Sequence, residues 1–144
     1  MAEYSKHEVV QILGFTSRTV QFYTDEGLII PDVANPKGHG ARRKYSRKNL
    51  FEFVLVKELT LYGLRLEKIH EIMFHLSIEP EKLWNLKTDM PLKKRFQLVV
   101  YNPHAKGLSA GFREGSSNIT IDMGHYSGAL VIDLSNLIKQ IERV

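Results

Sequence analysis

A stretch near the N-terminus, residues 16–45, combines side chains that are suited to contacting nucleic acid. It opens with the polar run Thr16-Ser17-Arg18-Thr19, whose hydroxyl and guanidinium groups can donate hydrogen bonds to phosphate oxygens or base edges. An amphipathic segment follows and ends at Gly27. This spacing favours recognition of a DNA duplex over catalysis, with a helix in the major groove and a second element on the backbone.

A cluster of cations is the candidate for that second element. No Asp or Glu interrupts the basic side chains between positions 37 and 48, which are Lys37, Arg42, Arg43, Lys44, Arg47 and Lys48. The net charge of the chain is only +4, so the distribution of charge is more informative than the total. Such a cluster is also typical of a solvated loop, but its position directly after a helix-turn-helix pattern favours contact with phosphates.

Two short helices are predicted to position the polar run. Ser5 and Glu8 form a capping box ahead of apolar residues at helical spacing, and a Gly-Phe pair ends that helix. Thr16 or Ser17 then caps a second helix. Two short helices joined by a turn that contains glycine form a helix-turn-helix.

A hairpin and two further helices are predicted next. Leu28–Ile30 is typical of a short strand, residues 32–41 of a loop, and Arg42–Tyr45 of a returning strand. A hairpin at this place is the wing of a winged helix. Ser46 caps a third helix, and a fourth is predicted over Leu66–Leu76.

The pattern changes after about residue 77. Strand-like runs lie at Phe96–Tyr101, Leu108–Arg113, Ile119–Met123 and Ala129–Leu134, and a final helix is predicted over Ser135–Val144. We therefore expect an α+β protein of two domains. Residues 1–76 form a winged helix-turn-helix domain, and residues 77–144 form a small α+β domain with an antiparallel sheet.

Four segments agree in order with one known family. They are SRTVQFY at 17–23, EGLI-x-P at 26–31, RKYS at 43–46 and G-x-x-L-x-x-I at 63–69. In these segments the first half of the chain resembles the MerR-type winged helix-turn-helix transcription regulators. Gln21 and Phe22 depart from the family pattern, which has an arginine and a tyrosine there, so two backbone contacts should differ.

From the residues and the resemblance together we expect DNA contacts from Ser17, Arg18, Thr19, Tyr23, Lys37, Arg42, Arg43 and Tyr45. Arg18 lies in the first helical turn and either reads a base edge or binds only a phosphate. Tyr23 either donates its hydroxyl to a phosphate or packs in the core. Lys44 alternates with its neighbours along a strand and should point the other way.

A homodimer is the usual way in which one short recognition helix gains specificity. The resemblance implies a homodimer at promoter elements, with RNA polymerase as a further possible partner. A long dimerisation helix is not visible in the sequence. We expect pairing through Leu134, Leu137, Ile138, Ile141 and Val144 of the last segment, or alternatively pairing of strand edges.

Composition narrows the range of functions that the protein could have. The chain has no cysteine, which excludes disulfides and thiolate metal sites, including the thiolate sensing that the resemblance implies for several relatives. His70 and His75 are five residues apart and do not share a helix face, so no metal is expected. Catalytic and cofactor motifs are missing, and we expect no enzyme and no cofactor. Without a long apolar run or a secretory leader, a cytoplasmic, bacterial and nucleoid-associated location is expected.

The leading hypothesis is a dimeric, sequence-specific transcription regulator. One alternative is an architectural or recombination accessory protein that bends DNA. Another alternative is a ligand-binding C-terminal module that the first half of the chain targets to DNA. The aromatic residues of this module could line a pocket as well as fill a core. They are Trp84, Phe96, Tyr101, Phe112 and Tyr126. The sequence leaves open whether a small-molecule effector exists.

Overall fold

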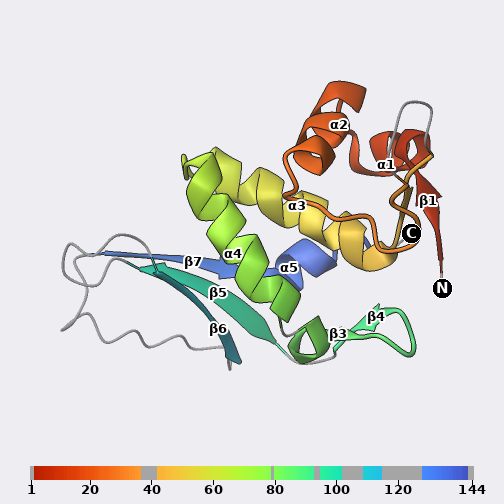
Figure 1. Ribbon diagram of the computed structural model, residues 1–144. Helices are drawn as coiled ribbons and strands as arrows, with labels where there is room; N and C mark the ends of the chain where they lie inside the picture. The colour runs from red at the N-terminus through yellow and green to blue at the C-terminus, as the bar shows by residue number, and fades with distance from the viewer. Residues whose placement is uncertain are drawn as a thin grey trace. The chain divides into compact units, whose positions relative to one another are not determined.

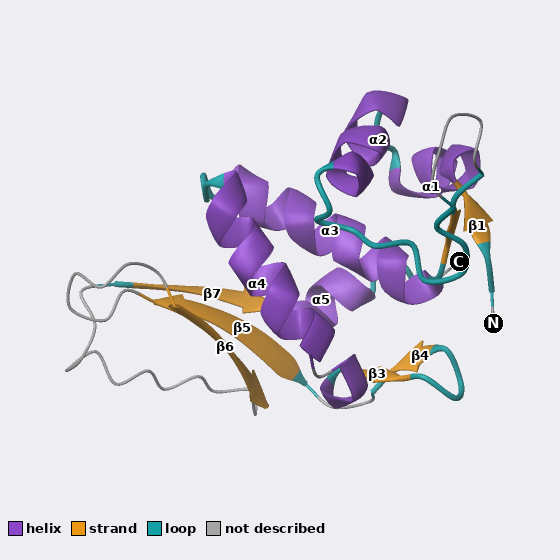
Figure 2. Ribbon diagram, viewed as in Figure 1, coloured by secondary structure: helices purple, strands orange, loops and turns teal. Residues whose placement is uncertain are grey.

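The computed structural model describes residues 2–36, 42–78, 80–92, 95–101, 109–114 and 128–142 (Figures 1 and 2). The chain divides into two compact units, Met1–Leu92 with Ile141–Val144, and Lys93–Gln140. Helices and antiparallel strands together confirm the predicted α+β class. The first unit extends beyond residue 76, where the sequence predicted the domain boundary.

Helices α1 (Lys6–Leu13) and α2 (Ser17–Asp25) form the predicted helix-turn-helix. The capping box of α1 is present: the Ser5 amide donates to Glu8 Oε2 at 2.7 Å, and the Glu8 amide donates to Ser5 Oγ at 3.2 Å. Thr16 caps α2 by accepting the Thr19 amide at 3.1 Å. Ser17 is therefore the first helical residue, and its side chain is not used by the cap.

The segment after α2 is not the strand predicted over Leu28–Ile30. The amides of Leu28 and Ile29 both donate to the Tyr23 carbonyl oxygen, at 3.0 and 3.2 Å, so the chain wraps around the last turn of the helix. Gly27 makes this possible because its φ of +74° lies in the left-handed region. Leu28 and Ile29 are buried instead, whereas Ile30 is exposed.

The wing contains the predicted return strand, but its partners differ from those expected. Strand β2 (Lys44–Tyr45) pairs antiparallel with β1 (Tyr4–Ser5) near the N-terminus. Ala34 forms an isolated bridge to Lys44, whose amide donates to the Ala34 carbonyl oxygen at 2.8 Å. The outgoing side of the wing thus lies near Ala34, and positions 37–41 fall outside the described residues.

Helix α3 (Arg47–Leu61) is the central element of the first unit. Leu50, Phe53, Leu55 and Leu59 are fully buried, and they lie on more than one side of the helix. Each buried side chain of this size contributes about 1.5–3 kcal/mol of hydrophobic stabilisation. Helix α4 (Leu66–Ile78) packs against α3 and is followed by a short 3-10 turn, η1 (Pro80–Lys82), and by the paired strands β3 (Trp84–Asn85) and β4 (Met90–Pro91).

The second unit is built on an antiparallel sheet of order β6-β5-β7 (Figure 2). Its strands β5 (Phe96–Tyr101), β6 (Ser109–Glu114) and β7 (Ala129–Asp133) confirm three of the predicted strands. The fourth, Ile119–Met123, lies outside the described residues. Asp133 caps a five-residue helix, α5 (Leu134–Ile138), which is shorter than the helix predicted over Ser135–Val144.

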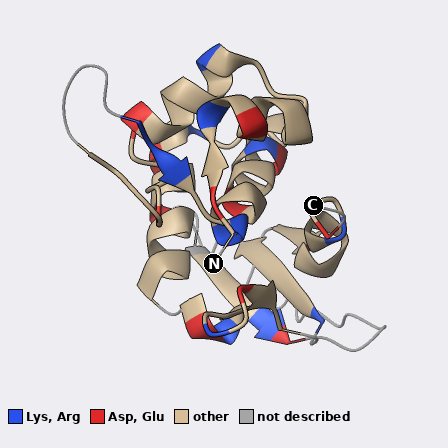
Figure 3. Cartoon of the chain, turned by 90° about the vertical axis from the view of Figure 1, so that its right-hand side faces the viewer, with Lys and Arg blue, Asp and Glu red and all other residues tan. Residues whose placement is uncertain are grey.

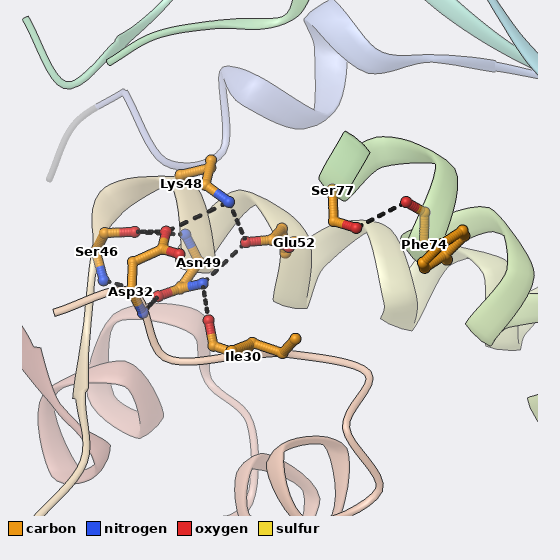
Figure 4. A network of polar contacts seen from close by, with 8 residues as sticks. All are labelled: Ile30, Asp32, Ser46, Lys48, Asn49, Glu52, Phe74 and Ser77. Atoms are coloured by element: carbon orange, nitrogen blue, oxygen red, sulfur yellow. Dashed lines mark hydrogen bonds and ion pairs between the residues drawn. The ribbon is translucent and has the colours of Figure 1, made fainter. Parts of the chain in front are cut away.

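Hydrogen bonds at the start of α3 join the two ends of the wing (Figure 4). Asn49 Oδ1 accepts the amides of Asp32 and Ser46 at 2.9 and 3.0 Å, and Ser46 Oγ donates to Asp32 Oδ2 at 2.7 Å. Asn49 Nδ2 donates to the Ile30 carbonyl oxygen at 3.0 Å and to Glu52 Oε1 at 2.9 Å. We call Asp32, Ser46 and Asn49 the wing clasp. Because Asn49 is fully buried and its amide is fully hydrogen-bonded, the clasp fixes the wing to α3.

The Asn49→Ala substitution is expected to lower the free energy of unfolding by roughly 2–4 kcal/mol, because it leaves buried backbone groups at the clasp without partners. Urea denaturation followed by circular dichroism measures this loss. Asn136→Ala, at an exposed position of α5, is the matched control and should stay within about 0.5 kcal/mol of the wild type. Equal stability of the two variants would show that the clasp does not hold the wing.

Candidate nucleic-acid interface

Helix α2 presents an exposed face that contains Arg18 and Phe22. The two residues are four positions apart and so lie on the same side of the helix. Arg18 is exposed and forms no hydrogen bond or ion pair with the described part of the chain, and Phe22 is 45% exposed although it is aromatic. Ser17 is also exposed, and the Thr19 hydroxyl lies 2.8 Å from that of Thr16. A guanidinium group, hydroxyls and an apolar ring are therefore available together at one helix start.

Tyr23 and Tyr45, both predicted to contact DNA, pack around Phe53. Tyr23 is 6% exposed and stacks on the Phe53 ring with centroids 6.4 Å apart. Tyr45 is fully buried, its ring centroid lies 5.3 Å from that of Phe53, and its hydroxyl lies 2.9 Å from Thr24 Oγ1. Burial raises the pKa of Tyr45. A buried ring with a satisfied hydroxyl has no surface to offer to DNA, so we assign Tyr45 to the core; a phosphate contact of Tyr23 stays a prediction.

A chain of polar contacts connects α1, α2 and the wing. Arg43 donates to Asp25 Oδ1 at 2.8 Å. Gln21 Nε2 donates to both carboxylate oxygens of Asp25, at 2.9 and 2.8 Å, and Gln21 Oε1 accepts from Lys6 Nζ at 3.0 Å. The hydrogen bonds from Gln21 and then from Arg43 hold the pKa of Asp25 below its usual value. Gln21, at the position where the sequence suggested a lost cation, therefore links α2 to α1 and, through Asp25, to the wing.

Three cations of the basic cluster, Arg43, Lys44 and Lys48, form ion pairs with carboxylates among the described residues. Arg43 pairs with Asp25, and Lys44 pairs with Glu3 at 3.5 Å, so the two neighbours have partners in different parts of the chain. That Lys44 points away from DNA stays a prediction. Arg42 is exposed and has no hydrogen bond or ion pair with any residue that the structure describes. Lys37 lies outside the described residues. Figure 3 shows acidic and basic positions interspersed along the ribbon.

Lys48 bridges two carboxylates beside the wing clasp (Figure 4). Its Nζ lies 3.3 Å from Asp32 Oδ2 and 3.3 Å from Glu52 Oε1. Burial alone would lower the pKa of Lys48, but the charges of Glu52 and Asp32 outweigh burial and raise it. Burial also raises the pKa of Glu52, in spite of the lysine. Lys48 thus stabilises the start of α3 through these two ion pairs and is not among the cations available to DNA.

The residues expected to dimerise are largely covered within one chain. Leu134, Leu137, Ile138 and Ile141 are each at most 5% exposed, and Val144 lies outside the described residues. Within the second unit, α5 packs against β5. A five-residue helix with its apolar side chains covered is a poor element for helix pairing. The role of these residues in dimerisation stays a prediction.

Across the described ranges, no group of three or more His, Asp or Glu side chains is placed to hold a metal ion. In those ranges, too, every helix is too short or too polar to cross a bilayer.

Comparison with known proteins matches the first unit to a family. The family model described as "MerR HTH family regulatory protein" covers residues 4–76, which include α1, α2, the wing and the α3–α4 pair. The chain belongs to the MerR HTH family. This confirms the resemblance inferred from the four sequence segments.

Curated members of the MerR family match the same half of the chain. The HTH-type transcriptional regulator CueR of Escherichia coli O6:H1 is 29% identical over 75 residues, which are 52% of this chain and 53% of that protein. CueR of Salmonella typhi is 30% identical over 66 residues, 46% of each chain. The uncharacterized HTH-type transcriptional regulator Rv1830 of Mycobacterium tuberculosis is 30% identical over 73 residues, 51% of this chain and 32% of that protein. This chain thus spans about half the length of the CueR proteins.

Sequence reasoning missed the residues that hold the interface together. Asp25 follows Gln21 at the i+4 spacing of a helix face, and Asn49 follows Ser46 at the spacing of a capping box. Both spacings are visible in the sequence and could have indicated these contacts. The partners Lys6 and Asp32 come from other elements, and no local spacing indicates them.

Proposed function

We propose that the protein is a sequence-specific DNA-binding transcription regulator that acts as a homodimer at promoter elements. The observation that carries this proposal is the exposed Arg18 and Phe22 face on the second helix of a MerR-family helix-turn-helix. An arginine that forms no hydrogen bond or ion pair with the described residues, together with an exposed aromatic ring on the same helix face, suits a surface that is covered when DNA binds.

In this proposal α2 enters the major groove with its first turn toward the bases. Arg18 donates two hydrogen bonds to the O6 and N7 atoms of a guanine, which is worth about 1–3 kcal/mol of discrimination. Phe22, one turn further along, makes an apolar contact with a thymine methyl group. The Ser17 and Thr19 hydroxyls and the free amides at the start of α2 bind flanking phosphates.

The wing supplies backbone contacts in this arrangement. Arg42 is exposed and reaches a phosphate directly. Arg43 uses one of its nitrogens for Asp25, and a guanidinium group carries five N–H donors, so donors remain for a phosphate. Because so few cations of the basic cluster stay available, affinity should depend on each of them strongly.

The short length of α2 supports a homodimer. Helix α2 has nine residues and can contact only a few base pairs, whereas a two-fold dimer doubles the recognised sequence. The outer strands β6 and β7 of the described sheet carry backbone donors and acceptors suited to pairing with a second copy. Contact with RNA polymerase belongs to the same proposal, since the site is a promoter element.

Binding of the chain to a duplex from upstream of its own gene, compared with a scrambled duplex, tests the proposal. We expect tighter binding to the upstream duplex and an affinity for both that falls as salt rises. Equal affinity for every duplex, or affinity that does not change with salt, would refute sequence-specific binding. A promoter reporter then separates a regulator from a protein that only bends DNA.

Arg18→Ala and Arg42→Ala are expected to weaken binding in different ways. Loss of Arg18 should remove about 1–3 kcal/mol of preference at one base pair, whereas loss of Arg42 should weaken all duplexes evenly and reduce the salt slope by about one. Fluorescence anisotropy with single-base variants of the duplex measures both. Lys139→Ala, in the second unit, is the control for loss of a cation. If Arg18→Ala leaves base preference unchanged, α2 is not the reading helix.

Asp25→Asn is expected to tighten binding by about twofold to fivefold, because it removes a negative charge beside the phosphates and releases Arg43. The salt slope should become steeper by roughly one. Glu71→Gln, which removes an exposed acid on α4, is the matched control and should not change the affinity. Weaker binding by a folded Asp25→Asn protein would mean that the ion pair positions Arg43 for DNA and does not restrain it.

A further inference from the structure

The first unit contains a cavity of about 560 Å³. Its walls come from the segment after α2, the start of α3, α4, and the β3–β4 hairpin, so distant parts of the sequence converge on it. The volume falls within the range of about 300–1,000 Å³ that small-molecule sites occupy. The proposed contacts of α2 and the wing with DNA do not use this space.

One part of the cavity wall is apolar and aromatic. Phe74 on α4 is 64% exposed and Ile30 is 60% exposed, whereas Trp84 is 2% exposed and stacks on Phe51 with centroids 6.2 Å apart. The indole Nε1 of Trp84 is buried without a hydrogen-bond acceptor among the described residues. Because this nitrogen is also shielded from solvent, an occupant of the cavity meets the exposed side chains of Phe74 and Ile30 and not the indole N–H.

The charged part of the cavity wall is acidic. Three carboxylates line it, those of Asp32, Glu52 and Asp89, against the single ammonium group of Lys48. Lys48 already lies 3.3 Å from two of these carboxylates, as Figure 4 shows, and is therefore not available to an anion. Burial raises the pKa of Glu52, although Lys48 lies beside it. The charge distribution favours a cation.

We propose that this cavity binds a small organic cation that has an aromatic or branched apolar body. The positive group lies toward Glu52 and Asp32, and the apolar body contacts the exposed ring of Phe74. The site requires no DNA and stands independently of the proposed function. It shares Asp32 and Ser46 with the wing clasp, so an occupant contacts residues that hold the wing.

Benzoylcholine and its uncharged isostere 3,3-dimethylbutyl benzoate form a probe pair that tests the proposal. The two esters have the same shape and the same oxygens and differ only in the quaternary ammonium charge. Trp84 is the single tryptophan of the chain and lines this cavity, so its fluorescence follows binding there, and calorimetry gives an independent affinity. We expect saturable binding of benzoylcholine to the full chain, at least about tenfold tighter than that of the isostere. Equal binding of the two esters, or no saturable signal with benzoylcholine, would overturn the proposal.

Substitutions in the cavity wall locate the site. Glu52→Gln keeps the shape and the hydrogen bond to Asn49 but removes the charge, and it should weaken benzoylcholine binding by about tenfold. Phe74→Ala removes an exposed ring, so it leaves the fold intact and should weaken binding by a similar factor. Glu71→Gln and Phe22→Ala remove an acid and an exposed ring outside the cavity and should bind like the wild type. Wild-type affinity in a folded Phe74→Ala protein, or losses equal to those of the controls, would show that the cavity is not the site.

Discussion

The side-chain amide of Asn49 makes hydrogen bonds to Ile30, Asp32, Ser46 and Glu52 from a position with no solvent exposure. These bonds join the chain that enters the wing to the chain that leaves it, at the first turn of the central helix. The return strand β2 therefore starts from a fixed point, and its Arg43 meets Asp25 at the end of α2. Through this sequence of contacts, one buried amide fixes the position of α2 relative to the wing.

Charge pairing gives this domain a different surface from the one that counting cations suggests. Arg43, Lys44 and Lys48 each form an ion pair with a carboxylate from another part of the chain, so three of the six cations in the basic stretch are paired internally. The pairs stabilise the wing and orient α2, but they leave fewer charges for phosphates. Specific contacts of α2 should then account for a larger share of DNA recognition than non-specific attraction does.

The sequence predicted those features that depend on neighbours in the chain. The capping box of Ser5 and Glu8, the helix-turn-helix and the strand Phe96–Tyr101 all arise from local spacing, and all are present. Leu28–Ile30 was wrongly predicted as a strand, because an apolar run does not show whether its amides pair with a strand or with the end of a helix. Tyr45 was predicted to contact DNA because the sequence does not show its burial against Phe53 or its hydrogen bond to Thr24. Both arise only in the folded chain. Ion pairs and the acidic cavity have the same non-local origin.

The clasp holds the wing and also contributes Asp32 and Ser46 to the cavity, so both proposed activities belong to the first unit. Amide hydrogen exchange of the full chain, with and without its upstream duplex, tests this most directly. We predict slower exchange on DNA binding in α2 and in the Val33–Tyr45 wing, with the strands β5–β7 unchanged or protected only by dimer formation. Protection confined to β5–β7, with α2 exchanging as fast as in the free protein, would contradict the assignment of DNA reading to the helix-turn-helix.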